Sequence, residues 1–156
     1  MADANDVAQI QAMLAPLVGR AAWGCRLGHG SFVTLEFGEP QPATGDVVHG
    51  AWHLWVYGCA WRVERGDELL AGSDDDRDAM ATAAHALDGL ELEGVTVHAP
   101  GLDATWRFSG GFCLRLFSMS ALQGEHWLVY LPDGQVLSAG PGGAWSLEPA
   151  AAGGVP

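Results

Sequence analysis

A chain of 156 residues with a formal net charge of −12 fits a single acidic globular domain. Its seven basic residues are all arginine and stand against nineteen acids, so the surface repels phosphate backbones and anionic membranes. No apolar run reaches the roughly 18 residues that cross a bilayer, and residues 1–18 lack the pattern of a secretory leader. We therefore expect a cytoplasmic protein, bacterial by its lysine-free composition, that binds neither nucleic acid nor membrane.

Residues 3–15 are predicted to form the first helix. Asp3 or Asn5 can cap its start, and apolar residues recur at helical spacing as far as Leu14. Because Pro16 disfavours helical backbone at the residue before it, the helix is expected to end or kink there.

Two strands are predicted next, over 20–27 and 31–37, with a Gly-His-Gly turn between them that is typical of a hairpin. After a loop over 38–50 comes the most aromatic stretch, 51–65, which holds three of the seven tryptophans. Val, Trp and Tyr favour strand, and both alternating faces of the stretch are largely apolar. The pattern predicts one long central strand covered on both sides, with a bulge at Gly58 that changes the direction of its second half.

A second helix is predicted inside an acidic segment, 64–93, that holds ten of the nineteen acids. Ser73 can cap this helix, and the acids after Ser73 suit its first turn, where the helix dipole stabilises negative charge. Gly89 can end it. The three consecutive aspartates lack the alternating ligands and the glycine of a calcium loop, so they are interpreted as helix-start chemistry and not as a metal site.

The last third of the chain is predicted to be strand and turn. Strands are expected over 90–98, 102–108, 112–117, 125–131 and 135–139, with a short piece around Trp145 and a flexible tail over 149–156. The whole pattern predicts a single α+β domain over 1–148. It would contain two helices and a mostly antiparallel twisted sheet of about seven to nine strands.

The two halves of the chain carry a weak internal repeat. In each half, a hairpin and a loop precede a strand in which His, two large apolar residues, Val and Tyr occur in order, from His53 to Tyr57 and from His126 to Tyr130. The order of elements agrees with two pseudo-repeats, 1–65 and 73–148. The alternative is a chance similarity between amphipathic strands.

If the repeat is structural, each His lies on the same strand face as its Tyr, and the two pairs converge on a pseudo-twofold axis. That arrangement would form a small ligand site in an aromatic shell. The alternative is that both histidines form local hydrogen bonds near the strand starts. The predicted ligand-binding residues are His53, Tyr57, His126, Tyr130 and Arg62.

Other reactive residue types form no recognisable centre. The three cysteines are far apart and are predicted to be buried, reduced thiols. His49 and His53 would lie about 13 Å apart along a strand, too far for one zinc ion unless the chain bends. Four arginines inside predicted strands are expected to pair with acids across strands, the alternative being a groove for an anion. We therefore expect no metal and no cofactor, and no catalytic pair stands out.

The C-terminal run WRFSGGFCLRLFSMSALQGEHWLVYLPDGQVLSAGPGGAW resembles a pattern found in small bacterial β-rich domains of unknown function. In that pattern a Gly-turn hairpin is followed by a strand, a Pro-Asp-Gly turn and a Gly-Pro-Gly-Gly turn. Some members lie in toxin-immunity-like gene contexts. The resemblance covers about a third of the chain and implies a β-rich fold without catalytic residues to carry over.

Two functions from different classes are consistent with the sequence. The first is a non-enzymatic, immunity-like interaction domain that docks a basic partner protein through its acidic segment. The second is a small-molecule binding domain or enzyme that uses the His- and Tyr-containing aromatic site. A homodimer through an exposed edge strand is a third expectation. The predicted partner-binding residues are Asp67, Glu68, Asp74, Asp75, Asp76 and Asp78.

Overall fold

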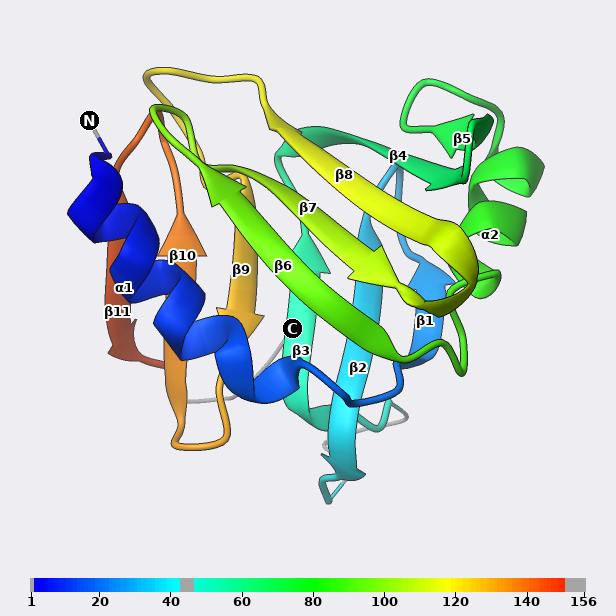
Figure 1. Ribbon diagram of the computed structural model, residues 1–156, viewed down its shortest axis with the longest axis horizontal. Helices are drawn as coiled ribbons and strands as arrows, with labels where there is room; N and C mark the ends of the chain where they lie inside the picture. The colour runs from blue at the N-terminus through cyan, green and yellow to red at the C-terminus, as the bar shows by residue number, and fades with distance from the viewer. Residues whose placement is uncertain (1, 43–46, 151–156) are drawn as a thin grey trace.

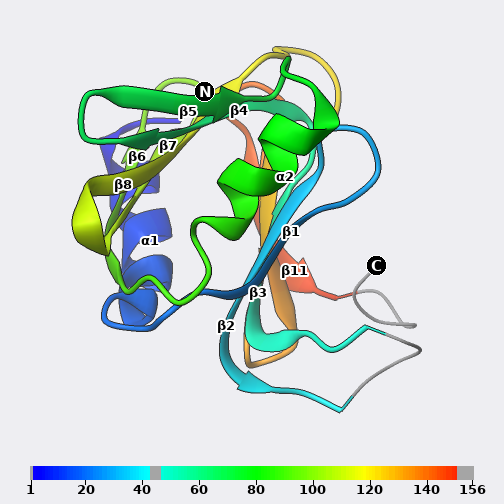
Figure 2. The ribbon, with the colours of Figure 1, turned by 90° about the vertical axis from the view of Figure 1, so that its right-hand side faces the viewer.

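The computed structural model describes residues 2–42 and 47–150, which fold into two antiparallel sheets and two α-helices (Figure 1). The predicted α+β class is confirmed. The expectation of one sheet is wrong, because the strands divide into a sheet of six and a sheet of five. The two sheets face each other across an apolar core, as the turned view also shows (Figure 2).

The six-stranded sheet lies at the back in Figure 1, and all its neighbouring strands are antiparallel. Its first three strands are neighbours in sequence, and the β3–β9 pairing then brings the C-terminal strands beside them. The strand order is β1 (Trp23–Leu27), β2 (Val33–Pro40), β3 (Gly50–Val56), β9 (Trp127–Tyr130), β10 (Gln135–Ala139) and β11 (Trp145–Pro149).

The five-stranded sheet lies in front of it and is also antiparallel throughout. A short 3₁₀ turn, η2 (Ser109–Gly111), joins β7 to β8. The strand order is β5 (Glu68–Gly72), β4 (Cys59–Arg65), β8 (Phe112–Ser118), β7 (Asp103–Phe108) and β6 (Leu92–His98).

The stretch predicted as one central strand, 51–65, is two strands in two different sheets. The break between β3 and β4 falls at Tyr57 and Gly58, whose N–H groups both donate to the carbonyl oxygen of His126. A Cβ atom at Gly58 would overlap the carbonyl oxygen of Glu125. The absence of a side chain therefore permits a close backbone approach, and the chain passes from one sheet into the other instead of forming a bulge within one strand.

The break also changes which alternate residues face the core. Before it the even-numbered residues of β3 are buried, and after it the odd-numbered residues of β4 are buried. These core residues are Trp52, Leu54 and Val56 in β3, and Cys59, Trp61 and Val63 in β4. As a result, the side chains of His53 and Trp55 point to the outer face of the six-stranded sheet.

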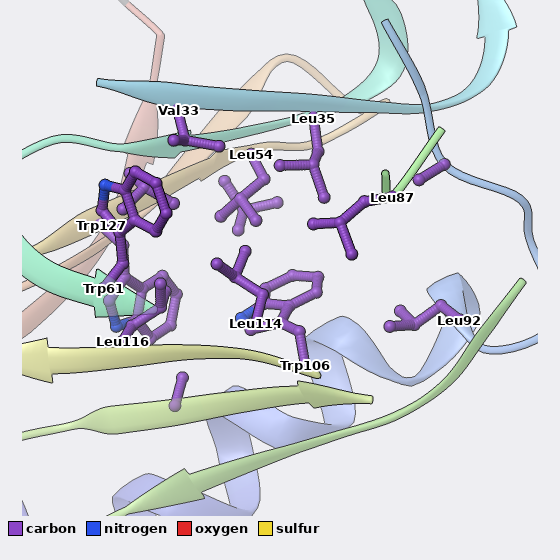
Figure 3. Close-up of a cluster of buried hydrophobic side chains, with 14 of the residues drawn as sticks. Val33, Leu35, Leu54, Trp61, Leu87, Leu92, Trp106, Leu114, Leu116 and Trp127 are labelled. Atoms are coloured by element: carbon purple, nitrogen blue, oxygen red, sulfur yellow. The ribbon is translucent and has the colours of Figure 1, made fainter. Parts of the chain in front are cut away.

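The core is filled from both sheets. In Figure 3, Leu35 and Leu54 of the six-stranded sheet approach Trp106 and Leu114 of the five-stranded sheet, and all four side chains are buried. Each aromatic ring in such a position removes roughly 150–250 Å² from water. Burial of this extent is the main stabilising contribution to the fold.

The first helix, α1 (Ala4–Leu14), agrees with its prediction. Asp3 caps it, and a reciprocal hydrogen bond between Asp3 and Asp6 completes a capping box. Its buried face packs against β6. The chain then forms a 3₁₀ turn, η1 (Ala15–Leu17), as expected from Pro16.

The second helix, α2 (Arg77–His85), starts later than its prediction and packs against β1 and β5. Its cap is Asp76, whose side chain accepts from the N–H of Ala79, whereas Ser73 Oγ accepts from the N–H of Trp61. The sequence prediction also lacks β5, which occupies the first part of the acidic segment. Neither helix in the described ranges is long and apolar enough to cross a membrane.

The C-terminal end of the described chain extends the six-stranded sheet. Pro149 belongs to β11, and the N–H of Ala150 donates to the carbonyl oxygen of Gly134. The predicted flexible tail therefore starts inside a strand, and its residues 151–156 lie outside the described residues.

Candidate functional site

The outer face of the six-stranded sheet carries an unusual group of buried polar side chains. Glu36 of β2 lies opposite His53 of β3, and His53 lies opposite Tyr130 of β9. Glu36 is fully buried and His53 is 1% exposed, although both point away from the apolar core. Polar groups are rarely buried to this extent unless they have hydrogen-bonding partners. The three side chains therefore mark a candidate binding site.

The carboxylate of Glu36 makes two hydrogen bonds. Nδ1 of His53 donates to its Oε2 at 2.7 Å, and the backbone N–H of Gly50 donates to its Oε1 at 2.9 Å. A Cβ atom at Gly24 would lie 3.1 Å from Cγ of Glu36, so the neighbouring strand β1 packs tightly over the side chain. These contacts fix the carboxylate in one orientation.

His49 also joins this group, and the prediction that His49 and His53 are too far apart is wrong. Their ring centroids are 4.3 Å apart. The separation of about 13 Å holds only for two residues of one continuous strand. His49 precedes β3, which begins at Gly50, and the chain bends there. A Cβ atom at Gly50 would lie 2.5 Å from the carbonyl oxygen of Phe37, so glycine permits the approach that places His49 over the sheet.

The electrostatics of the group depend on the buried carboxyl group of Glu36. An ionised carboxylate without solvent requires a positive partner or several hydrogen bonds. Nδ1 of His49 lies 3.5 Å from Oε2 of Glu36, and its side chain is 13% exposed. Burial lowers the pKa of His49 and the neighbouring His53 lowers it further, whereas Glu36 acts in the opposite direction. The free imidazole of His49 therefore favours its neutral form, with a lone pair available.

Two ring nitrogens of this group have no hydrogen-bond partner in the described structure. They are Nδ1 of His49 and Nε2 of His53, and both are shielded from solvent. One donor atom from each of Glu36, His49 and His53 lies within 4.8 Å of the other two. These three side chains are therefore close enough to share one cation. We call them the Glu36–His49–His53 cluster.

A row of aromatic rings continues along the same face. Phe32 stacks on Trp55 with ring centroids 5.4 Å apart and on Tyr57 with centroids 4.5 Å apart. Trp55 and Tyr57 are 5.1 Å apart and are tilted by only 21°. Tyr57 remains 47% exposed. We call Phe32, Trp55 and Tyr57 the aromatic stack.

The turn that carries Phe32 is held from α2. The guanidinium of Arg77 donates to the carbonyl oxygens of Gly28 and Gly30, at 2.8 and 2.7 Å. The fork of two N–H donors fits two adjacent carbonyl groups, so it fixes the orientation of the turn. Phe32 is thereby kept in its stacked position.

Tyr130, on the neighbouring strand β9, lies beside the cluster. Its ring centroid lies 5.7 Å from that of His53. Partial burial raises the pKa of the Tyr130 hydroxyl, and Glu125 raises it further. The hydroxyl therefore stays protonated at neutral pH and can donate a hydrogen bond.

The structure brings together only some of the ligand-binding residues predicted from the sequence. His53 and Tyr130 are adjacent, but Tyr57 and His126 lie at the other end of the β3–β9 pair. Tyr130 lies opposite His53, and His126 precedes Tyr130 by four positions, so the two histidines are about 13 Å apart along the sheet. They do not converge on one site.

His126 is instead packed beneath a glycine turn. It is fully buried, and its Nε2 lies 3.1 Å from the carbonyl oxygen of Gly142. A Cβ atom at Gly140 would lie 2.7 Å from its ring. For His126 this agrees with the alternative interpretation from the sequence, whereas His53 lies in the middle of β3 and bonds to Glu36 of the neighbouring strand.

The two similar segments also differ in their place in the fold. The first hairpin, β1–β2, lies in the same sheet as the next strand, β3. The second hairpin, β7–β8, lies in the five-stranded sheet, whereas β9 lies in the six-stranded sheet. Similar sequences therefore occupy different positions.

Arg62 lies on β4 in the other sheet, away from the residues with which it is grouped in the sequence prediction. It pairs there with Glu64, which also binds Arg115 at 2.9 Å. Burial alone would raise the pKa of Glu64, but the hydrogen bonds from Arg115 and Arg62 lower it overall. The predicted cross-strand pairing is confirmed for Arg115 of β8, whereas Arg62 pairs with Glu64 of its own strand.

The six acidic residues predicted to bind a partner are all exposed, at the β4–β5 turn and around the start of α2. Some of them have local structural roles. Glu68 pairs with Arg65, Asp75 accepts from the N–H of Gly72, and Asp76 caps α2. The acids are Asp67, Glu68, Asp74, Asp75, Asp76 and Asp78.

The cysteines form no reactive centre. Cys25 and Cys59 are buried, and Cys113 is half-buried. Burial and the carboxylate of Asp88 raise the pKa of the Cys25 thiol, and burial with Asp103 raises the pKa of Cys59 to about 12. Both thiols are therefore protonated at neutral pH and are poor nucleophiles.

A surface cavity of about 680 Å³ lies elsewhere, between the loops after β6, β8 and β10. It is open and is lined by proline, glycine and other small residues together with Met119, without a titratable side chain. A ligand site needs convergent polar groups as well as volume. The buried polar groups described above therefore lie on the outer face of the six-stranded sheet and not in this cavity.

A scan against protein-family models, a search of curated proteins and a search of solved structures each found no match. The resemblance to small bacterial β-rich domains stays a prediction.

Sequence reasoning missed Glu36, whose carboxylate lies near both histidines of the cluster, and Phe32, which stacks on both Trp55 and Tyr57. One signal could have identified Glu36. It is a charged residue inside an otherwise alternating apolar strand, Val33 to Phe37, and its position opposite His53 is determined once the β2–β3 register is set.

Proposed function

We propose that the protein is a small-molecule binding domain, without catalytic activity, whose ligand lies on the outer face of the six-stranded sheet. The observation that carries this proposal is the aromatic stack: three nearly parallel rings, with Tyr57 47% exposed at its edge. Stacked rings prefer flat partners at similar spacing. The Tyr130 hydroxyl and the His49 side chain, which is 13% exposed, are polar groups further along the same face.

The ligand class is inferred from shape and charge. A flat, neutral or cationic ring can stack on Tyr57 and Trp55, and a cation gains further from the negative faces of the rings. The net charge of −12 disfavours anions. We therefore propose planar, uncharged or positively charged small molecules and not nucleotides or other phosphates.

Ligand-observed NMR with a library of neutral, cationic and anionic ring compounds tests this proposal. Neutral and cationic rings are expected to bind the wild-type protein, and Y57A is expected to weaken binding by about tenfold, the loss of one stacking contact. The matched control is L69A, which removes another exposed side chain on a different sheet. Binding that is equal in Y57A and wild type would contradict the proposal.

A second candidate is an immunity-like interaction domain that docks a basic partner protein through the acidic turns. It is favoured by the concentration of six exposed acids around the β4–β5 turn and the start of α2, of which only Glu68 pairs with an arginine of the described chain. Charge complementarity of this kind mainly increases the association rate and weakens with salt.

A pull-down at low salt from the organism that carries the gene tests this candidate. The wild-type protein is expected to retain a basic protein that is released by salt and lost with D67N/D74N. The control is E91Q/E93Q, which removes two exposed acids near β6. Retention by both variants alike would contradict docking at the acidic turns, and light scattering of the isolated protein tests the homodimer expectation.

A further inference from the structure

We propose that Glu36, His49 and His53 form a binding site for a single divalent transition metal ion of the zinc class. This inference does not rest on the proposed ligand site, because the aromatic stack contributes no donor atom to it. It rests on the positions of three side chains on the outer face of the six-stranded sheet.

The distances suit one ion. Zinc binds imidazole nitrogen and carboxylate oxygen at about 2.0–2.2 Å, so two ligand atoms in a tetrahedral site lie about 3.3 Å apart. Oε2 of Glu36 lies 3.5 Å from Nδ1 of His49 and 2.7 Å from Nδ1 of His53. If the side chains of Glu36 and His53 move slightly apart, an ion can therefore lie between the three atoms.

The donor atoms are available for a metal. Nδ1 of His49 is shielded from solvent and has no hydrogen-bond partner among the described residues. Nδ1 of His53 shares a proton with Glu36, and the ion replaces that proton, which leaves to Nε2 of the same ring or to solvent. Nε2 of His53 is itself without a partner in the described structure, so the ring can accept the proton there.

The charge balance also favours a cation. Glu36 is fully buried, and among the described residues the groups that reach its carboxylate are one backbone N–H and two imidazoles. A buried carboxylate is stabilised by a charged partner, and a divalent ion supplies that charge without protonating either histidine. The ion therefore removes the main electrostatic cost of the cluster.

The kind of donor defines the class of metal. Two imidazoles and one carboxylate suit zinc, copper, nickel or iron, whereas calcium and magnesium require a shell of oxygen ligands. No thiolate belongs to the cluster. Three protein ligands leave a fourth position for water or a small ligand, as in open zinc sites.

The contacts that hold the ligand residues in position are already present in the structure. The N–H of Gly50 holds Oε1 of Glu36, and Gly24 packs against its Cγ. The carbonyl oxygen of His49 accepts from the N–H of Gln41, which fixes the backbone that carries the second imidazole. Such supporting contacts typically change metal affinity by about 10–100-fold.

Calorimetric titration of untagged, chelator-treated protein with ZnCl₂ tests the proposal. The wild-type protein is expected to bind one Zn²⁺ per chain, and Co²⁺ at the same site is expected to show visible d–d absorption. H49Q removes one ligand at a partly exposed position and keeps the Glu36–His53 bond, so it is expected to fold and to bind zinc at least about tenfold more weakly. H98Q, at an exposed position on β6, is the matched control and keeps wild-type affinity.

Three outcomes would overturn the proposal. These are no zinc uptake by the wild-type protein, equal affinity in H49Q and wild type, or an equal loss in H98Q. E36Q provides a second variant that preserves the side-chain shape and is expected to lose zinc binding. Because Y57A leaves all three ligands intact, it is expected to retain zinc, so failure of the proposed ligand site and failure of the metal site are distinguishable.

Discussion

Nδ1 of His53 lies 2.7 Å from Oε2 of Glu36, on the side of the six-stranded sheet that faces away from the core. The pair is sealed from solvent although it belongs to an outer face. This position means that the pair holds a buried charge without contributing to the apolar core between the sheets. The contribution of the Glu36–His53 pair to stability and to binding can therefore be tested separately from core packing.

Replacing Glu36 with alanine is expected to destabilise the metal-free protein by about 3–5 kcal/mol, because it leaves the N–H of Gly50 and Nδ1 of His53 buried without an acceptor. Urea unfolding at pH 7 measures the change. E93A removes an exposed carboxylate of β6 and is expected to stay within about 0.5 kcal/mol of wild type. A loss in E36A no larger than in this control would show that the carboxylate is not buried as described.

Replacing Gly58 with alanine is expected to cost about 1–3 kcal/mol or more, since the new Cβ overlaps the carbonyl oxygen of Glu125 where the chain passes between the sheets. G72A is the matched control, because its Cβ would meet its nearest neighbour at an ordinary 3.4 Å. Thermal unfolding distinguishes the two variants. Equal melting temperatures would contradict the close approach at Gly58.

The buried thiol of Cys59 is expected to make the protein sensitive to alkali. Burial, with a contribution from Asp103, raises its pKa from 9.0 to about 12. A raised pKa in the folded state means that the stabilising contribution is complete below pH 9 and is lost as the pH rises from 9 to 12. Between pH 7 and about pH 10.5, wild type is expected to lose about 1–2 kcal/mol more than C59A.

The test compares how much the free energy of unfolding of each protein changes between the two pH values. The absolute stability is not informative, because C59A also loses apolar contacts. Urea unfolding of both proteins at both pH values gives this difference. Parallel losses in the two proteins would show that the thiol ionises as easily in the folded chain as in the unfolded one.

Loss of Arg77 is expected to loosen the turn that carries Phe32 without unfolding the protein. R77A removes both donors to the carbonyl oxygens of Gly28 and Gly30, so hydrogen exchange at the N–H of Phe32 is expected to be about tenfold faster or more. R65A removes an exposed ion pair with Glu68 and is expected to leave that exchange unchanged. Unchanged exchange in R77A would contradict the anchoring role.

Elements with strong local signals could be predicted from the sequence. The cap at Asp3, the helical stripe after it and the stop at Pro16 are local features, and the helix ends where they indicate. The hairpin before β3 is predicted by its glycine turn in the same way. The start of α2 differs from its prediction because several residues from Ser73 to Asp78 are acceptable caps, and tertiary contacts select Asp76.

The division into two sheets could not be predicted, because it depends on one backbone approach between segments far apart in sequence. Nothing near Gly58 in the chain indicates that the carbonyl oxygens of Glu125 and His126 lie against it. The cluster was missed for a similar reason. The bend at Gly50 that brings His49 over His53 depends on packing against Phe37 of the neighbouring strand.

A crystal structure of the zinc-soaked protein, with data collected on both sides of the zinc absorption edge, tests the central claim most directly. We predict one anomalous difference peak about 2.0–2.2 Å from the carboxylate of Glu36 and from one ring nitrogen each of His49 and His53. A map without a peak at these three side chains, or with zinc bound only at other surface histidines and acids, would contradict the account.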